Sequence, residues 1–291
     1  MCVDRDPVAA PVGDHATLSH PFAAAHRLRA PGLSPVAECD WLRIDGDEPA
    51  RLAERDALVA RHGPGVVAIG QGGAQAARDF AAQLRRALSA VPGYRVAPDH
   101  VQRPDGVRLG ADADLLARAT ADDWLLLLPD DGAQGHRLVA GSACYPAHWR
   151  LQDKLGKPLD LIHAPVPGYA GSLAPRVNRI FANLSPGRPL ERHNWSIGAS
   201  GARYTPPEVR PPIGPEGPWL RVERQTLLRP LGSDMVIFSV RTALAPLGAL
   251  DAALKTRVRA ALEALPEAMR RYKFREDVLS TAEALLAPGA G

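Results

Sequence analysis

The sequence is poor in cysteine, and its few cysteines are not clustered. The 291 residues include only Cys2, Cys39 and Cys144, and no two of them form a Cys-x-x-Cys pair. A zinc ribbon or a four-cysteine iron–sulfur site needs clustered thiolates, so this spacing excludes either site within the chain alone. A small, odd number of cysteines is also typical of a reducing compartment.

Long hydrophobic runs and blocks of one charge are missing as well. The longest apolar run, residues 124–129, is far too short to cross a bilayer, and the first twenty residues carry aspartates and histidines rather than a signal peptide. We therefore expect a cytoplasmic protein with no membrane association. The 35 basic and 32 acidic side chains are mixed along the chain without a basic arm, so we expect no nucleic-acid partner.

Hydrophobic periodicity divides the chain into a helical first part and a mixed second part. Residues 1–30 are rich in proline and alanine and are interpreted as an irregular lead-in. Residues 31–120 predict a helical cap, with apolar residues at helical spacing over 52–62, 75–88 and 112–119.

Residues 121–265 alternate between strand and helix patterns. Strand patterns cover 123–129, 136–144, 192–199, 219–228 and 235–242, and helical patterns cover 149–156, 173–184 and 250–265. This order predicts an α+β core, an antiparallel five-stranded sheet with helices packed on one face. Residues 266–291 are interpreted as a C-terminal helix and tail.

The segment Ile-His-Ala-Pro-Val-Pro-Gly-Tyr around His163 is the most informative local feature. Its two prolines fix φ and remove backbone donors, so the chain after His163 cannot simply continue a helix. An imidazole held by such a stiff turn can bind a metal, transfer a proton or make a buried hydrogen bond. The order of elements would place His163 in the wall of a pocket over the sheet, and these three roles stay open.

Strong hydrogen-bond donors concentrate on the last three predicted strands. Arg192-His193-Asn194-Trp195 lies on one strand, RVERQ (221–225) on the next and Arg241 on the last. Because side chains alternate between the two faces of a strand, a charged group points to the covered side or its rim. One interpretation is an Arg–Glu pair on a solvated face. The other is a polar lining that orients a small substrate or an oxygen ligand.

Two further motifs allow other interpretations. The segment VVAIGQGG (66–73) is similar to a dinucleotide fingerprint, but Gln75 stands where a third small residue is needed and no βαβ pattern follows. We therefore favour a flexible helix start. Cys144 and His148 could form a nucleophile pair, yet no orienting third group or oxyanion loop accompanies them.

Several motifs, in a fixed order along the chain, resemble one family. They are GLSPVAECDWLRID (32–45), CYPAHW (144–149), IHAPVPGY (162–169), RHNW (192–195), LRVERQTL (220–227) and the late pair Tyr272-Lys273. Together they resemble the haem-binding alpha subunit of the haem-dependent oxidative N-demethylase family. The resemblance covers most of the chain, from about residue 32 to residue 273.

The resemblance implies a PAS-like core that binds haem b, with His163 as the axial ligand. It also implies that haem and O2 oxidise a small secondary amine such as dimethylamine, releasing formaldehyde. Electrons would come from NADPH through a separate flavin/iron–sulfur reductase subunit, which agrees with the lack of a cysteine cluster in this chain.

With haem in this place, the predicted metal ligand is His163. The predicted cofactor contacts are His163, Pro165, Val166, Tyr169 and Trp195. The predicted catalytic lining on the opposite side of the iron comprises Arg224, Glu223, Arg241 and Asn194. Glu223 would hold a protonated amine, and an arginine would stabilise charge that develops on bound oxygen.

Two other functions are compatible with the same residues. One is a PAS-like haem-based gas or redox sensor, a binding protein without turnover, because fold alone does not fix function. The other is a haem-free homologue that acts as a scaffold subunit.

Overall fold

The computed structural model describes residues 17–23, 32–130 and 135–287. Most of the predicted irregular lead-in, residues 1–30, lies outside the described residues. Among the described residues, no helix combines the length and apolarity that crossing a bilayer requires.

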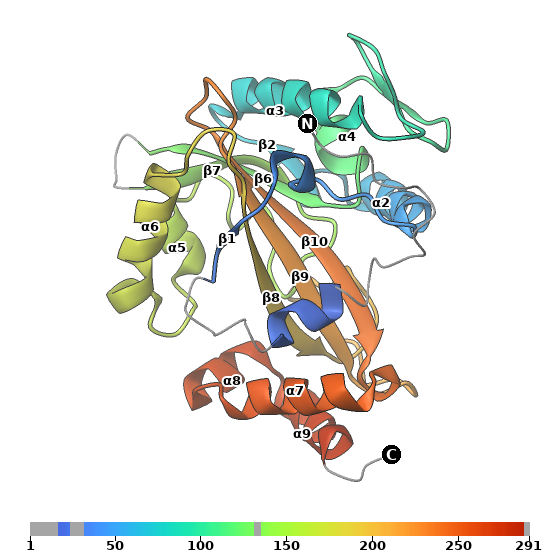
Figure 1. The fold of residues 1–291 in the computed structure, drawn as a ribbon, viewed down its shortest axis with the longest axis vertical. Coiled ribbons are helices and arrows are strands. Elements are labelled where there is room, and N and C mark those ends of the chain that lie inside the picture. The colour runs from blue at the N-terminus through green and yellow to red at the C-terminus, as the bar shows by residue number, and fades with distance from the viewer. Residues whose placement is uncertain (1–16, 24–31, 131–134, 288–291) are drawn as a thin grey trace.

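A large antiparallel sheet forms the centre of the molecule (Figure 1). Its strands follow the order β1-β8-β9-β10-β6-β7-β2. Their bounds are β1 (Ser34–Pro35), β2 (Val67–Ile69), β6 (Asp123–Pro129), β7 (His136–Ser142), β8 (Leu190–Gly198), β9 (Trp219–Leu228) and β10 (Val236–Pro246). A second, three-stranded sheet contains β3 (Arg95–Val96), β4 (Val101–Gln102) and β5 (Arg108–Leu109).

The prediction of five strands was wrong, because the sheet has seven. The five predicted strands are present as β6 to β10 and are neighbours in the sheet. The two additional strands, β1 and β2, contain only two and three residues and pair with β8 and β7 at the two edges. Such short strands show too little alternation to be recognised in a sequence.

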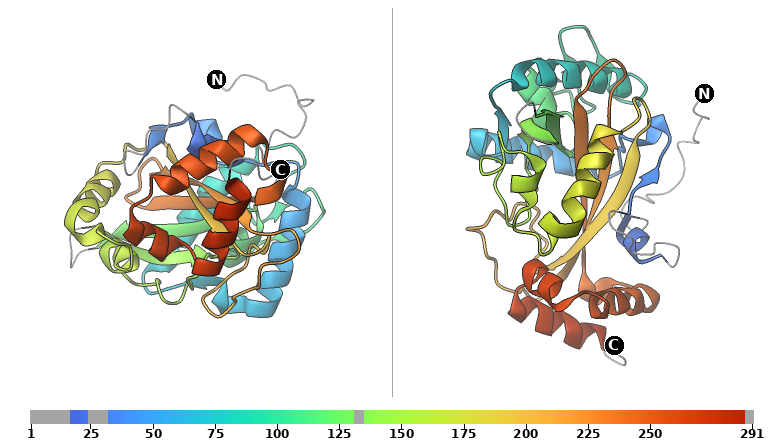
Figure 2. Two further views of the ribbon diagram at one scale, coloured as in Figure 1. Left: turned by 90° about the horizontal axis from the view of Figure 1, so that it is seen from below. Right: turned by 90° about the vertical axis from the view of Figure 1, so that its left-hand side faces the viewer.

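Helices pack on both faces of the sheet, so the prediction of helices on one face was also wrong. The described α-helices are α2 (Glu48–His62), α3 (Gly73–Leu88), α4 (Asp112–Arg118), α5 (Leu159–His163), α6 (Ala174–Ala182), α7 (Ala252–Glu263), α8 (Glu267–Lys273) and α9 (Glu276–Leu286). Short 3-10 or π-helices are η1 (His20–Phe22), η2 (Glu38–Asp40), η3 (Gly63–Gly65), η4 (Tyr169–Leu173) and η5 (Leu247–Ala249). Figures 1 and 2 show α5 and α6 beside the sheet, α2 to α4 near one end and α7 to α9 across the other.

We name the two faces after the helices that pack on them. On the α5 face, Leu159 of α5 and Phe181 of α6 pack with Leu227 of β9. On the α3 face, Phe80 of α3 packs with Trp124 of β6, at a ring-centroid distance of 5.2 Å. The lower part of this second face is covered by α7 and α9. The apolar stripes of these helices and alternate residues of the strands thus form one core on the α5 face and two on the α3 face, one under α3 and one under α7 and α9.

The structure reassigns two predicted helices. Residues 149–156 were predicted to be helical, but they form consecutive turns that end at Gly156, whose φ is 79°. The left-handed conformation of Gly156 changes the direction of the chain, so these turns do not continue into a helix. The C-terminal helical pattern is divided into α8 and α9, because Phe274 between them is extended. The predicted boundary between cap and core near residue 120 stays a prediction.

The glycine-rich segment before α3 contributes close packing. β2 pairs antiparallel with β7, so the segment does not belong to the parallel βαβ unit that a dinucleotide fingerprint requires. Gly73 begins α3 directly against β7, where a Cβ atom would collide with the carbonyl oxygen of Val139. The glycine therefore allows α3 to approach the sheet.

We expect Gly73→Ala to destabilise the protein by about 1–3 kcal/mol, the usual cost of overpacking. Helix propensity alone would favour alanine by up to about 1 kcal/mol. Urea denaturation measures the difference, with Gly248→Ala as the control because Gly248 has open space around its Cβ position. The control should change stability by no more than about 0.5 kcal/mol. Equal stability of Gly73→Ala and the wild type would contradict this packing role.

Candidate functional site

His163 is the last residue of α5, and its ring is fixed by a backbone hydrogen bond. Its Nδ1 lies 2.9 Å from the carbonyl oxygen of Leu159. Because a carbonyl oxygen only accepts hydrogen bonds, Nδ1 carries the proton and Nε2 presents its lone pair. Burial lowers the pKa of His163, and the charges of Lys154 and Arg192 act in the same direction. The imidazole is therefore neutral near pH 7, as a metal ligand has to be.

The turn after His163 positions Tyr169 against the imidazole. The amide of Val166 donates to the carbonyl of His163 at 2.9 Å, and the amide of Tyr169 donates to the carbonyl of Val166 at 3.1 Å. The rings of Tyr169 and His163 stack with their centroids 4.9 Å apart. Burial, with the Asp160 carboxylate nearby, raises the pKa of Tyr169 to about 12. Pro165 is exposed and Val166 is half-buried. More of the Pro165 side chain than of the Val166 side chain is therefore accessible to a ligand.

Polar side chains form two cross-strand rows on the α5 face. In one row Arg192 of β8 lies opposite Gln225 of β9. In the next row Asn194 lies opposite Glu223. We call these four residues, together with Lys273 of α8, the polar cluster.

Glu223 is the centre of the polar cluster. It accepts hydrogen bonds from Arg221 Nε at 3.0 Å, Gln225 Nε2 at 3.0 Å and Asn194 Nδ2 at 3.3 Å. Burial alone would raise its pKa, but Arg221 and these hydrogen bonds outweigh burial and lower it. Glu223 is consequently an ionised carboxylate at neutral pH, held in one orientation.

Lys273 completes the polar cluster from a distant part of the chain. Its Nζ donates to the side-chain oxygen of Asn194 at 3.0 Å and to the carbonyl oxygen of Trp195 at 2.7 Å. Burial lowers the pKa of Lys273 to about 8, because the charge of Glu223 only partly offsets the loss of solvation. The pKa of Lys273 is thus close to neutral pH, so a small change in its surroundings can remove the proton of its amine.

Arg192 is the member of the polar cluster whose hydrogen bonds are incomplete. Its Nε is buried and has no hydrogen-bond partner among the described residues. Burial lowers the pKa of Arg192, and the nearby charge of Glu223 opposes this effect. An arginine stays charged in proteins, so a buried guanidinium with an unpaired nitrogen is suited to an anionic ligand. Arg192 lies opposite Gln225 and therefore on the α5 face, and its charge contributes to lowering the pKa of His163.

The structure brings together some of the predicted site residues and separates others. Glu223 and Asn194 lie on the α5 face, the face on which the helix that ends at His163 packs. Trp195 points to the opposite face, where it packs between Phe22 and Phe274. It therefore does not share a face with the four strand residues of the polar cluster, although the Lys273 Nζ lies 5.5 Å from the centre of its ring.

The two predicted catalytic arginines also lie on the α3 face. Arg224 donates to Glu191 and to the carbonyl oxygens of Asp40 and Trp41. Arg241 is bound by three carboxylates, those of Asp45 at 2.7 Å, Glu48 at 2.7 Å and Asp122 at 3.2 Å. Both guanidinium groups are buried and fully engaged with the N-terminal part of the chain, which marks them as structural.

The thiol of Cys144 is a poor nucleophile in this fold. The residue is completely buried, and burial raises the pKa of its thiol to about 12. A nucleophilic cysteine needs the opposite shift. The pair with His148 is therefore not a candidate for covalent catalysis.

Arg192, Gln225 and Lys273 were not among the predicted site residues. Strand alternation could have found the first two, because they lie two positions from Asn194 and Glu223 on the same strands. Lys273 comes from a helix that follows β10, and no local pattern indicates that it reaches Asn194.

The fold and site define an α+β protein whose polar cluster lies on one face of a sheet, the face to which the histidine helix packs. The chain matches the family described as haem-dependent oxidative N-demethylase, alpha subunit-like, over residues 99–282. This match spans more than half of the chain and includes both His163 and the polar cluster. The chain therefore belongs to that family. No curated protein gives a significant match.

The residues of the α5 face fit the haem that the family name implies. A neutral histidine with its proton on Nδ1 has Nε2 for iron, as axial histidines do. The propionate groups of haem are anions, and the buried Nε of Arg192 has an unused donor. His163 thus suits the iron of haem, and Arg192 suits its propionate groups.

We expect Arg241→Ala to cost about 3–5 kcal/mol of stability, because three buried carboxylates would lose their cation. Arg241→Lys should retain part of the stability, since it keeps the charge. Chemical denaturation checks both variants. Arg271→Ala is the control, because its ion pair with Glu267 is exposed, and it should cost at most about 1 kcal/mol. A loss below 1 kcal/mol in Arg241→Ala would count against the structural role.

Proposed function

We propose that this chain binds haem b over the α5 face of the sheet, in a PAS-like core, and oxidatively demethylates a small secondary amine. The adjacency of β6 to β10 in the sheet supports the PAS-like assignment. When bound, haem supplies the activation of O2 and the oxidation chemistry. The roles below are those of the protein's own side chains.

His163 is the proposed iron ligand. The hydrogen bond between its Nδ1 and the Leu159 carbonyl is the single observation that carries the proposal, because it fixes the tautomer that leaves Nε2 for a metal. The stacked ring of Tyr169 restrains the plane of the imidazole. Tyr169 and Val166 are proposed to line the cofactor on this side.

Arg192 is the proposed partner of a haem propionate. A charge-assisted hydrogen bond to its buried Nε would satisfy a donor that has no other partner among the described residues. Lys273, the second cation of the polar cluster, would strengthen the positive potential at the same edge of the sheet.

Glu223 and Asn194 are the proposed contacts of the amine. A carboxylate has about four acceptor positions, and Glu223 uses three of them. The remaining position can accept an N–H bond from a protonated secondary amine. Because Arg221 and Gln225 hold the carboxylate rigidly, little side-chain entropy would be lost on binding.

Electrons are proposed to come from a separate reductase subunit with flavin and an iron–sulfur cluster, using NADPH in the cytoplasm. The family description names an alpha subunit, which supports a multi-subunit enzyme. The three unclustered cysteines of the sequence support placing the cluster in a partner.

We expect His163→Ala to abolish or strongly shift the Soret band of the haem-loaded protein, because iron loses its axial nitrogen. Absorption spectra of protein reconstituted with haem measure this change. His100→Ala is the control, since His100 lies between β3 and β4 of the separate three-stranded sheet, beside Asp99, and should not affect the band. An unchanged spectrum of His163→Ala would disprove the ligand assignment.

The same spectra separate the ligand from the propionate contact. Arg192→Leu should leave the position of the band unchanged but increase the rate or extent of haem transfer to apomyoglobin about tenfold, as loss of one charge-assisted hydrogen bond implies. Arg188→Leu, a change of an exposed arginine just before the same strand, should behave like the wild type.

We expect the haem protein to convert dimethylamine and O2 to methylamine, formaldehyde and water when a chemical reductant in excess supplies the two electrons that each turnover consumes. Glu223→Gln should raise the amine concentration required for half-maximal product about tenfold or more, because the neutral amide loses its charge-assisted bond to the ammonium group. Its Soret band without amine should match the wild type. Glu208→Gln, which changes an exposed carboxylate, is the control.

The assay also distinguishes the enzyme from the alternative. If several secondary amines give no formaldehyde although the haem is reduced and binds oxygen, the chain is a haem-based sensor or binding protein. Equal amine dependence of Glu223→Gln and the wild type would remove Glu223 from the substrate site.

A further inference from the structure

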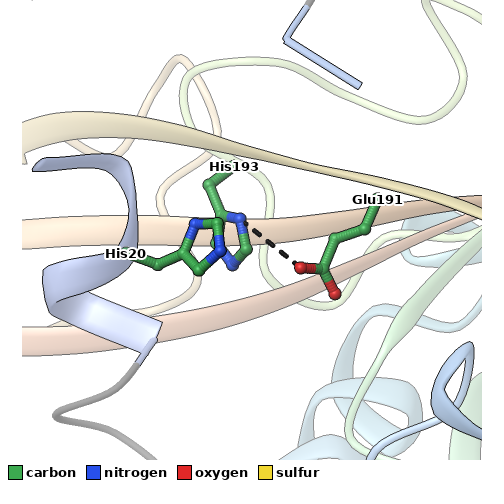
Figure 3. Close-up of side chains that lie close together, drawn as sticks. All are labelled: His20, Glu191 and His193. Atoms are coloured by element: carbon green, nitrogen blue, oxygen red, sulfur yellow. Dashed lines mark ion pairs between the residues drawn. The ribbon is translucent and has the colours of Figure 1, made fainter. Parts of the chain in front are cut away.

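A second group of ligating side chains lies on the opposite side of β8. Glu191 and His193 project from β8 toward His20 of the short helix η1 (Figure 3). The ring centroids of His20 and His193 are 3.8 Å apart, and His193 Nδ1 lies 3.9 Å from a carboxylate oxygen of Glu191. Residues 20 and 193 are far apart in sequence, so only the fold brings these ligands together.

The three side chains are a metal-ligand set in both chemistry and spacing. One potential ligand atom from each residue lies within 4.8 Å of the other two. Two atoms bound to one zinc ion at about 2.1 Å are separated by roughly 3.4 Å in a tetrahedral site. The nitrogen lone pairs lie in the ring planes and the two rings are stacked at an interplanar angle of 24°, so His20 has to turn out of the stack for both imidazoles to bind one ion. Two imidazoles and one carboxylate suit borderline divalent ions such as Zn²⁺.

The surroundings of Glu191 support a coordinating role despite nearby positive charge. One carboxylate oxygen accepts a hydrogen bond from Arg224, and the other faces His193. Outer hydrogen bonds of this kind orient carboxylate ligands at metal sites. Arg43 and Arg224 add positive charge close to Glu191, so affinity has to come from the imidazole nitrogens rather than from net charge.

We propose that His20, His193 and Glu191 bind a divalent transition-metal ion of the Zn²⁺ class, which fastens η1 to β8. Three protein ligands leave a fourth coordination position for water or another donor. The ion would lie directly behind Arg192 and Asn194, which point to the other face of the same strand. This site is distinct from the proposed haem site and does not depend on it.

Equilibrium dialysis of the full chain against ZnCl2, after treatment with a chelator, tests the site. Zinc measured by mass spectrometry is unaffected by haem iron. We expect one Zn²⁺ per chain, and His20→Ala and His193→Ala should each weaken binding at least about tenfold. His62→Ala is the matched control, because His62 also stacks on another ring, that of Tyr204, but belongs to no such group among the residues that the structure describes.

The outcomes are separable from those of the haem experiments. His163→Ala should bind zinc as the wild type does, whether or not it retains haem. His20 is half-buried and lies on a short helix, so we expect His20→Ala to fold. This variant therefore tests the site even if His193→Ala folds poorly. Absence of stoichiometric zinc, or unchanged affinity in both variants, would overturn the proposal.

Discussion

The register between β8 and β9 is the constraint on which both faces of the sheet depend. Asn194 lies opposite Glu223, and His193 lies opposite Arg224. Because neighbouring residues of a strand point to opposite faces, this pairing sends the carboxylate to the α5 face and the guanidinium to the α3 face. A slip of one residue would exchange the two sets and leave buried charges without partners.

The α3 face uses its charges to hold the N-terminal part of the chain. Arg224 binds the backbone at Asp40 and Trp41, and Arg241 binds Asp45 and Glu48. These contacts join segments almost two hundred residues apart, and they are expensive to break because the groups are buried. Arginines that resemble a catalytic lining in the sequence are therefore occupied in fixing the chain that leads into α2.

Long periodic elements could be predicted from the sequence, whereas their spatial relations could not. The bounds of β6 and β9 agree with prediction, because each strand has a clear pattern with defined ends. Alternation divides the residues of a strand into two sets, but it does not tell which set each helix covers. Glu223 and Arg224 therefore belong to different sets, but only the fold shows that Glu223 lies on the α5 face and Arg224 on the α3 face. Lys273 and His20 reach β8 from opposite ends of the chain, and no local signal contains that information.

The proposal of haem on the α5 face rests on chemical complementarity between unused groups. His163 has a nitrogen lone pair available for a metal, and Arg192 has a buried donor available for an anion. Haem carries both partners, an iron and two carboxylates, whereas a bare metal ion would satisfy only the histidine and a simple anion only the arginine. A sensor would share these two requirements with an oxidase. Glu223 keeps one acceptor position beyond its ion pair with Arg221 and its hydrogen bonds from Asn194 and Gln225, and a protonated amine would fill that position whereas a neutral gas would not need it. This asymmetry favours an amine oxidase among the haem functions.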